Sequence, residues 1–377
     1  MSERGTFDTI VGLGGAPRMR SSESLDRQRR AAVNSADGFA EELEGDALKG
    51  LWLVEGRIDA PSTIKPHVWR AGMLRAYLER AGELMRLSNS PVRRALLLWN
   101  PGAKDHWDVT NTLTASVQMM RPGESVTAHR HIHSTMMYIT EGKSAYTIVN
   151  GQRISLSAGD LVLAQNWQWH EHGNDSDSDI VWMTGLDRAL VKLLDAIYFE
   201  GHPDKHQTVT SVDDGVGPKP VAEAADPRFS PQLVWRRDEI WAALEHRRKL
   251  GDFSPYDDVI EVFRNPATGG HVTPTFGCAI QMLRPGIRTK AHRHTTSAVY
   301  HVVRGSGYSI VEGRRYDWSE GDYFALPHRC WHEHANASAS EPAVLFSLTD
   351  EPAFEALALR REEYWEQNDG HQFENLD

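Results

Sequence analysis

Short apolar segments separated by turns dominate the middle of the chain. Between about residues 95 and 184, apolar runs end at turn-forming sequences such as Asn100-Pro101-Gly102 and Asn150-Gly151. The second of these favours a tight β-hairpin. A regular series of short strands joined by Gly-containing turns is typical of a β-sandwich or barrel. A similar series runs from Thr275 to about Ser347, so the pattern predicts two β domains.

Other segments carry apolar residues at helical spacing or lack a regular pattern. We expect a clear amphipathic helix within residues 66–85 and further helices at 41–51, 234–250 and 354–365. Residues 200–232 are rich in Pro, Gly and Asp, which predicts a linker. The predicted organisation is a mobile tail (1–36), a helical extension (37–90), a first domain (91–199), a linker with a helix (200–258), a second domain (259–350), and a C-terminal helix and tail (351–377).

The two predicted β domains share an internal repeat. Residues 116–131 read SVQMMRPGESVTAHRH and residues 279–294 read AIQMLRPGIRTKAHRH, a spacing of 163 residues. Each copy is followed by Trp-His-Glu-His, at residues 169–172 and 331–334. These motifs hold eight of the 18 histidines. A duplication that carries its histidines with it points to their chemistry.

The spacing of these histidines predicts metal ligands. Successive side chains on a strand point to opposite faces, so His129 and His131 share one face, and His170 and His172 share another. Two such strands opposed across a small barrel bring imidazoles together. Neutral imidazoles suit iron, zinc, copper or nickel. The alternative is a set of surface or core histidines without metal, which two matching His-x-His pairs make the weaker interpretation.

Composition narrows the class of protein. A chain of 377 residues is long enough for two domains with full cores. Its net charge of −11 argues against non-specific binding to nucleic acid or to an anionic membrane. No segment approaches the roughly 20 apolar residues that span a bilayer, and the N-terminus lacks a secretory signal pattern. Cys278 and Cys330 form no CxxC motif, so we expect a reducing, cytoplasmic location.

At this point the motifs carry a family resemblance. Gly123 to His131 and Gly286 to His294 resemble the first cupin motif, and His170 to Asn174 and His332 to Asn336 resemble the second. The chain over about residues 90–350 therefore resembles a bicupin. The phrases PGESVTAHRH, EGKSAYTIVNGQR, WQWHEHGN and WMTGLD are similar to ring-cleaving gentisate, salicylate and 1-hydroxy-2-naphthoate dioxygenases. The resemblance implies a mainly β fold of two double-stranded β-helix (jelly-roll) barrels with N-terminal, linker and C-terminal helices.

The resemblance also implies a cofactor and a reaction. Fe(II) would be held by His129, His131 and His170 in the first cupin, without the usual cupin glutamate. Three coordination positions would remain for O2 and for the carboxylate and phenolate of a small aromatic hydroxy acid. The implied enzyme is an extradiol-type dioxygenase. It opens gentisate or a 5-substituted salicylate between the carbons that bear the hydroxyl and the carboxylate.

Several further residues receive roles from the resemblance. Arg93 and Gln118 match substrate-binding positions, and we also place both in the catalytic set with His172. His172 either exchanges a proton with the substrate or supports the ligands. Trp169 is expected to form an aromatic wall.

Two pocket positions depart from the family pattern. Met137 stands where relatives carry an arginine that binds the substrate, so a carboxylate clamp is lost. His133 is a candidate replacement donor. The alternative is that both residues only pack, but a shifted substrate preference is the favoured interpretation.

The second copy keeps the same ligand pattern in His292, His294 and His332. It either binds a second metal or keeps these histidines as a hydrogen-bonded core. We place catalysis in the first copy, because the helix at residues 66–85 and Arg93 precede it and could close it.

Other functions stay open at this stage. They are 1-hydroxy-2-naphthoate cleavage, a metal-dependent bicupin isomerase, decarboxylase or hydrolase that does not use O2, and a non-enzymatic storage or sensor protein. Relatives commonly form homotetramers, so a homo-oligomer without nucleic-acid or membrane partners is expected.

Overall fold

The computed structural model describes residues 37–58, 62–87, 93–213 and 226–375, so the tail expected at residues 1–36 lies outside the described residues. The chain divides into two compact units, Met1–Ser62 and Thr63–Asp377. In the first unit, the single helix expected over residues 41–51 is wrong. Two helices are present, α2 (Asp37–Gly45) and α3 (Leu51–Ile58). Ala47 has a positive φ of 58°, which interrupts the helical path between them.

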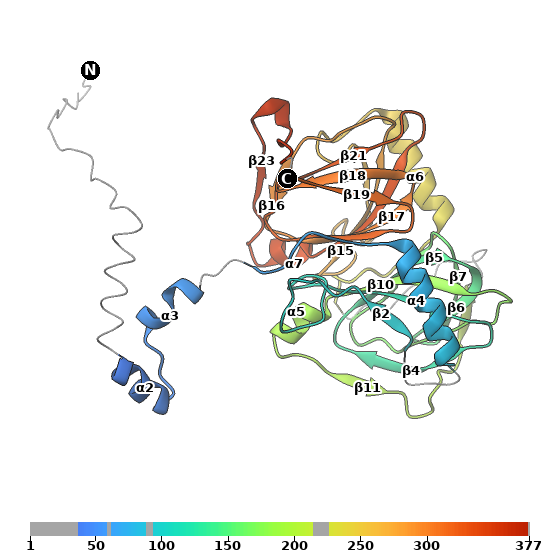
Figure 1. Cartoon of the computed structure of the whole chain (residues 1–377). Coiled ribbons are helices and arrows are strands. Elements are labelled where there is room, and N and C mark those ends of the chain that lie inside the picture. Colours follow the sequence, from blue (N-terminus) through green and yellow to red (C-terminus); the bar gives the residue numbers. More distant parts are fainter. Residues whose placement is uncertain (1–36, 59–61, 88–92, 214–225, 376–377) are drawn as a thin grey trace, which may run out of the picture. The chain divides into compact units, whose positions relative to one another are not determined.

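The second unit contains two β barrels, which confirms the predicted mainly β, two-barrel fold (Figure 1). Two sheets, ordered β13-β8-β5-β10-β3-β2 and β11-β4-β9-β6-β7-β12, build the first barrel. Its strands are β2 (Ala95–Leu97), β3 (Thr114–Met120), β4 (Ser125–His131), β5 (Thr135–Glu141), β6 (Lys143–Val149), β7 (Gln152–Ser157), β8 (Leu161–Ala164), β9 (His170–Gly173), β10 (Ile180–Leu186), β11 (Phe199–Gly201), β12 (Ser211–Asp213) and β13 (Val234–Trp235). Asn150 and Gly151 both have positive φ, as the predicted hairpin between β6 and β7 requires.

The second barrel repeats this arrangement. Its sheets are ordered β1-β20-β17-β22-β15-β14 and β19-β18-β21-β16-β23. Its strands are β1 (His67–Trp69), β14 (Val259–Val262), β15 (Gly277–Leu283), β16 (His292–His294), β17 (Ala298–Arg304), β18 (Ser306–Val311), β19 (Arg314–Ser319), β20 (Tyr323–Leu326), β21 (His332–Asn336), β22 (Ala343–Thr349) and β23 (Glu362–Tyr364).

Segments outside the two repeats complete the sheets. Part of the predicted linker packs on the first barrel, because β11 pairs with β4 and β12 pairs with β7. In the second barrel, β1 from the N-terminal side pairs with β20, and β23 from the C-terminal side pairs with β16. These additions matter for function, because β11 and β23 lie beside the strands that carry the His-x-His motifs.

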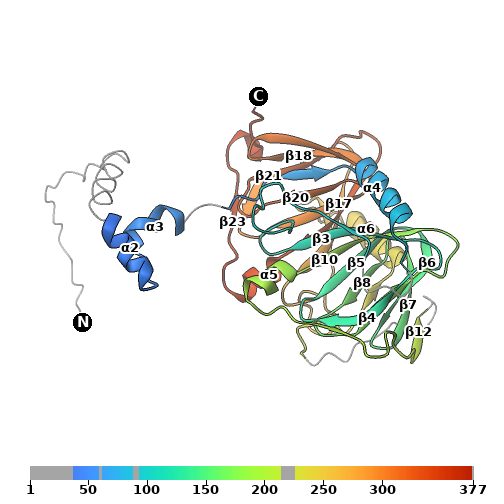
Figure 2. The same ribbon diagram turned by 60° about the horizontal axis from the view of Figure 1, so that its bottom comes forward.

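The helices of the second unit are α4 (Ala71–Leu84), α5 (Arg188–Leu193), α6 (Arg237–Leu250) and α7 (Glu351–Ala356), followed by the short 3-10 helix η1 (Asn368–Gly370). The helix predicted over residues 354–365 is wrong. It ends at Ala356, and Glu362–Tyr364 is a strand because its backbone finds partners on β16. Figure 2 shows α4 beside both barrels. No helix within the described ranges has the length and hydropathy that a membrane crossing requires.

The two barrels share one apolar core. The rings of Tyr138 and Phe346, from opposite barrels, stack with centroids 4.2 Å apart. Two buried carboxylates add polar links, because Asp187 accepts a hydrogen bond from Thr275 and Asp350 accepts one from Thr112. Burial raises the pKa of Asp187 to about 6. The barrels therefore pack as one body.

Candidate active site

The first histidine cluster is assembled by the pairing of two strands. His129 on β4 lies directly opposite His170 on β9, and His131 is two residues further along β4 on the same face. Their ring centroids lie 4.2 Å (His129–His170), 4.7 Å (His131–His170) and 5.6 Å (His129–His131) apart. One ring nitrogen from each histidine lies within 4.8 Å of the other two. The structure thus brings together the three ligands expected from the sequence.

Backbone contacts fix which nitrogen of each ring is free. Each Nδ1 donates to a carbonyl oxygen, with distances of 2.9 Å (His129 to Thr127), 2.6 Å (His131 to His133) and 2.9 Å (His170 to Gln168). A carbonyl oxygen only accepts, so each Nε2 keeps its lone pair. Burial lowers the pKa of His129 to about 2 and that of His131 to about 4. The rings are therefore neutral, as metal ligation requires.

This donor set fits a transition-metal ion. Three neutral imidazoles suit Fe(II), Zn(II) or another borderline ion. Among the described residues, the cluster is made of the three histidines without a carboxylate. Three protein ligands leave coordination positions for other molecules, as in catalytic rather than structural sites.

Arg93 reaches the centre of this cluster. It precedes β2, whose Ala95 pairs with Gln118 of β3, and its guanidinium donates a hydrogen bond to Nε2 of His129. That nitrogen is the one left free for a metal. The structure therefore places the positive charge of Arg93 beside the three histidines.

A cavity of about 400 Å³ opens beside the cluster. Of the residues that the sequence assigned to the pocket, Arg93, Gln118, His133, Met137 and His172 all line it. The helix expected to close this site does not, because α4 instead borders a separate hollow between the two barrels. The segment from α5 to β11 takes that place and contributes Ile197 and Phe199 to the rim.

Hydrogen bonds orient two polar side chains of the cavity, those of His172 and Gln118. Thr147 donates its hydroxyl proton to the carbonyl of Glu171, so Nδ1 of His172 donates to Thr147 over 3.0 Å. Nε2 of His172 is then an acceptor. The amide nitrogen of Gln118 donates to Thr184 over 2.6 Å, which leaves its oxygen as an acceptor. Both residues therefore offer lone pairs to a bound molecule.

Two buried polar groups of the cavity wall have no hydrogen-bond partner among the residues that the structure describes. They are Nδ1 of His133 and Oγ1 of Thr135. Both residues line the cavity, and the His133 ring stacks on His131 with centroids 3.6 Å apart. Buried polar groups are normally hydrogen-bonded, so these two atoms mark a place for a polar atom of a ligand.

Trp169 does not belong to the cavity. It precedes His170, so it points to the opposite face of the strand and packs against the guanidinium of Arg130, 4.4 Å from its ring centroid. Its ring also contacts His202. The aromatic wall expected at this position is therefore wrong, and the aromatic rings of the cavity are those of Trp107 and Phe199.

Sequence reasoning missed Arg188, a second guanidinium at the cavity. It begins α5 directly after the buried Asp187 and lines the cavity with Leu186. The nearest acid is Asp108, 3.6 Å from Nη1 of Arg188. A comparison of the two repeat copies could have revealed Arg188. The equivalent position, 163 residues later, is Glu351, so the charge changes sign between the copies.

Comparisons with known proteins agree with this site. A family model described as "Cupin domain" matches residues 116–186 and 279–349. A 5-aminosalicylate 1,2-dioxygenase from Comamonas sp is 35% identical over 82% of this chain and 84% of its own. A gentisate 1,2 dioxygenase 1 from Aquipseudomonas alcaligenes is 32% identical over 89% of this chain and 98% of its own. The structure of salicylate 1,2-dioxygenase from Pseudoaminobacter salicylatoxidans, in adducts with gentisate, matches with a TM-score of 0.78 and 27% identity, over 93% of this chain and 96% of that one.

The chain belongs to the bicupin ring-cleaving dioxygenases. Within this dioxygenase, the second barrel keeps a matching cluster of His292, His294 and His332. The two clusters occupy equivalent places in their barrels. Only the first is accompanied by both an arginine before the barrel and an arginine at the start of the following helix, among the described residues.

Proposed function

We propose that this protein is an Fe(II)- and O2-dependent dioxygenase that opens gentisate or a 5-substituted salicylate between the carbons bearing the hydroxyl and the carboxylate. The observation that carries the proposal is the placement of three Nε2 atoms that keep their lone pairs beside a cavity with two guanidiniums. The relatives named for 5-aminosalicylate and gentisate support the substrate class. The relatives support a ring-cleaving dioxygenase and do not confirm the extradiol-type label expected from the sequence.

His129, His131 and His170 would hold the iron, which when bound supplies the redox chemistry with O2. The chain's own residues bind and orient the substrate. Arg93 binds the anionic end of the substrate beside the ligands, since its guanidinium already reaches His129. Arg188 adds a second positive charge at the cavity wall. Together they favour a small organic acid over a neutral phenol.

His172 accepts a hydrogen bond from the substrate hydroxyl in this proposal. Its Nε2 is an acceptor because Nδ1 donates to Thr147. Burial lowers the pKa of His172 to about 3, so the ring stays neutral and serves as a hydrogen-bond acceptor that orients the substrate. The oxygen of Gln118 orients the same hydroxyl or a ring substituent.

The cavity wall formed by Met137, His133 and Thr135 determines which substituents the substrate ring can carry in this proposal. Met137 contributes apolar surface where a family arginine is expected, and His133 and Thr135 contribute polar atoms without protein partners. A salicylate with a hydrogen-bonding 5-substituent fits this combination. The apolar rim, with Leu97, Trp107 and Ile197, gives a second candidate, a fused-ring acid such as 1-hydroxy-2-naphthoate.

The deciding experiment is oxygen uptake by the iron-loaded protein. The panel contains salicylate, gentisate, 5-aminosalicylate, 5-chlorosalicylate and 1-hydroxy-2-naphthoate, with iron counted per chain. We expect one mole of O2 consumed per mole of acid, and loss of the aromatic absorbance. Release of CO2 or isomerisation without O2 uptake would instead establish a cupin decarboxylase or isomerase.

We also propose that the enzyme is a cytoplasmic homotetramer. Leu193, Leu194, Ile197, Tyr198 and Phe199 are all exposed on the segment from α5 to β11. A run of exposed apolar side chains is typical of a surface that another subunit covers. Cys278 and Cys330 are free thiols, which fits a reducing compartment. Light scattering on a sizing column should give four times the chain mass of 42.4 kDa.

A further inference from the structure

The second barrel rebuilds the ligand geometry of the first. His292 on β16 lies directly opposite His332 on β21. The ring centroids lie 4.3 Å (His292–His332), 4.9 Å (His294–His332) and 5.4 Å (His292–His294) apart. These values differ from those of the first cluster by a few tenths of an ångström at most. One nitrogen from each ring again lies within 4.8 Å of the other two.

The free nitrogens are again fixed by contacts to Nδ1. His332 donates from Nδ1 to the carbonyl oxygen of Cys330 over 3.0 Å. Nδ1 of His294 lies 3.0 Å from the carbonyl oxygen and 2.7 Å from the hydroxyl oxygen of Thr296, and a proton on Nδ1 satisfies both contacts because a carbonyl oxygen only accepts. Nδ1 of His292 instead donates to the carboxylate of Glu362, also over 3.0 Å. A carboxylate behind a ligating histidine raises the basicity of the imidazole, an arrangement common in metal sites. The second cluster therefore has a partner that the first lacks.

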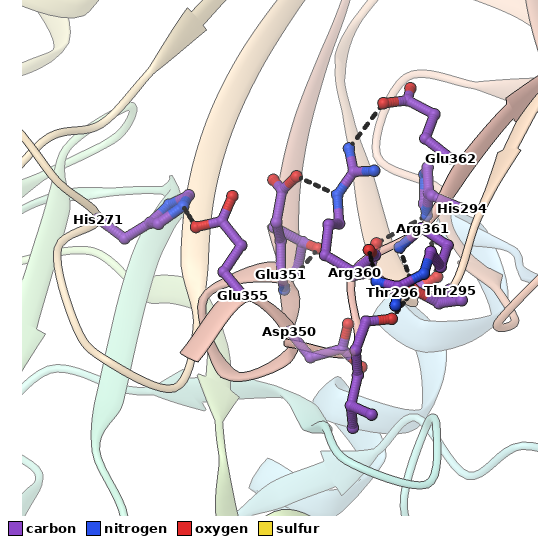
Figure 3. A network of polar contacts seen from close by, with 12 residues as sticks. His271, His294, Thr295, Thr296, Asp350, Glu351, Glu355, Arg360, Arg361 and Glu362 are labelled. Atoms are coloured by element: carbon purple, nitrogen blue, oxygen red, sulfur yellow. Dashed lines mark hydrogen bonds and ion pairs between the residues drawn. The ribbon is translucent and has the colours of Figure 1, made fainter. Parts of the chain in front are cut away.

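Carboxylates stand beside the second cluster at two positions where the first barrel has other residues. Glu351 stands at the repeat position of Arg188, and Glu362 stands at that of Phe199. Figure 3 shows Arg360 between these two carboxylates, beside His294. The hollow beside His294 is lined by Arg293, Arg329 and Arg361 as well as by Glu362 and Glu363, so positive and negative groups alternate there. The feature that favours a cation is the carboxylate of Glu362 directly behind His292.

Aromatic rings occupy the space that the first barrel leaves as a cavity. Tyr300 stands at the repeat position of Met137 and stacks on Phe324, with its edge toward His334. Tyr256 stacks on His292 with centroids 5.0 Å apart and also on Tyr364 of β23. His294 is the only partly exposed member of this described cluster and borders a surface hollow of about 230 Å³. An ion can enter where an aromatic acid has little room.

We propose that His292, His294 and His332 form a second, structural metal site, which binds a divalent transition ion such as Fe(II) or Zn(II) and anchors strand β23. The link runs from the metal through His292 to Glu362, and β23 also pairs with β16. Binding an ion to residues from separate strands stabilises their folded arrangement. The site takes no part in ring cleavage and does not depend on the proposed substrate.

Metal counting tests the proposal independently of activity. The metal-free protein is loaded anaerobically with Fe(II) alone, and in parallel with Zn(II) alone, and bound metal is counted per chain. We expect two ions in the parent, one in His170→Ala, one in His332→Ala and none in the double variant. His332→Ala should keep oxygen uptake within about twofold of the parent. One ion per chain in the parent, or an unchanged count in His332→Ala, would overturn the proposal.

Two milder variants test the same site if His332→Ala does not fold. Glu362→Gln removes the carboxylate behind His292, whereas Glu363→Gln alters the next residue of β23, whose carboxylate pairs with Arg293 on the outer face. In the His170→Ala background, Glu362→Gln should weaken metal retention against a chelator roughly tenfold, and Glu363→Gln should not. Removing the metal should also speed amide hydrogen exchange across residues 362–364. Equal retention in both variants, or exchange insensitive to metal, would contradict the site.

Discussion

His133 stacks on the ligand His131 with an interplanar angle of 10°, although its own Nδ1 has no protein partner. We therefore expect this nitrogen to meet a polar atom of the substrate. His133→Phe keeps a stacking ring and removes the nitrogen. It should raise KM for acids with a polar 5-substituent roughly 10-fold to 100-fold, the cost of an unmade buried hydrogen bond. Steady-state oxygen uptake with 5-aminosalicylate and 5-chlorosalicylate measures the difference.

The control for this change is His133→Gln, which keeps a donor and an acceptor. It should recover much of the affinity for the polar substrate. Equal loss for both substrates in His133→Phe would show that His133 only supports the His131 ring.

Met137 lies on the cavity wall and is almost fully buried. Met137→Arg introduces a guanidinium that can hold a substrate oxygen in two hydrogen bonds. We expect the ratio of kcat/KM for gentisate to that for 5-chlorosalicylate to rise roughly tenfold. Met136→Leu is the matched control, because Met136 belongs to the opposite face of β5 near Gly185 and Leu348. An unchanged ratio in Met137→Arg would assign position 137 to packing alone.

Arg93 lines the cavity and contacts Nε2 of His129, and the proposed function assigns its charge to substrate binding rather than to metal binding. Arg93→Ala should raise KM for every acid of the panel by about 100-fold, because a charged hydrogen bond is worth roughly 1.5–3 kcal/mol. The iron content should stay at the parent level. Arg93→Lys keeps the charge without the planar fork and should recover part of the affinity. Loss of iron in Arg93→Ala would contradict this assignment.

His170 completes the first cluster from β9, opposite His129. His170→Ala should abolish oxygen uptake and remove the metal of the first barrel together, since two imidazoles remain. Activity and iron are measured on the same preparation. Near-normal turnover in this variant would move catalysis to another site, with the second barrel as the first place to test.

Asp187 is buried between the barrels, where burial raises its pKa from 3.8 to about 6. A raised carboxyl pKa means that the folded protein prefers the protonated form. Its contribution to stability therefore falls as the pH rises from about 4 through about 6. Asp187→Asn keeps an oxygen for the Ser134 amide. As the pH rises across that range, the free energy of unfolding of Asp187→Asn should increase by roughly 2–3 kcal/mol relative to that of the parent, at about 1.4 kcal/mol per pKa unit. Urea denaturation of both proteins at pH 4.5 and pH 7.5 measures the change. A difference in stability that does not vary with pH would show that Asp187 does not titrate with a raised pKa.

Much of the fold could be predicted because its signals are local. The alternation of apolar residues, the Asn150-Gly151 turn and the repeat are all visible in short windows of sequence. The errors arose where a distant partner decides the structure. Residues 362–364 have no strong strand pattern, yet they form β23 because β16 offers unpaired backbone groups. Trp169 is an exception, because local alternation places it on the face opposite to its neighbour His170, where it packs on Arg130.

The sequence by itself determined which metal-ligating side chains this protein has. Two copies of His-x-His with a later His are enough to predict two sets of imidazole ligands, because strand alternation is a property of the backbone. Only the tertiary structure decided what surrounds each set. Arg93 and Arg188 reach the first cluster from segments 95 residues apart, while Glu362 and Tyr256 reach the second from outside its repeat. Charge and free volume arise from such distant contacts, and they separate a site for an aromatic acid from a site for an ion.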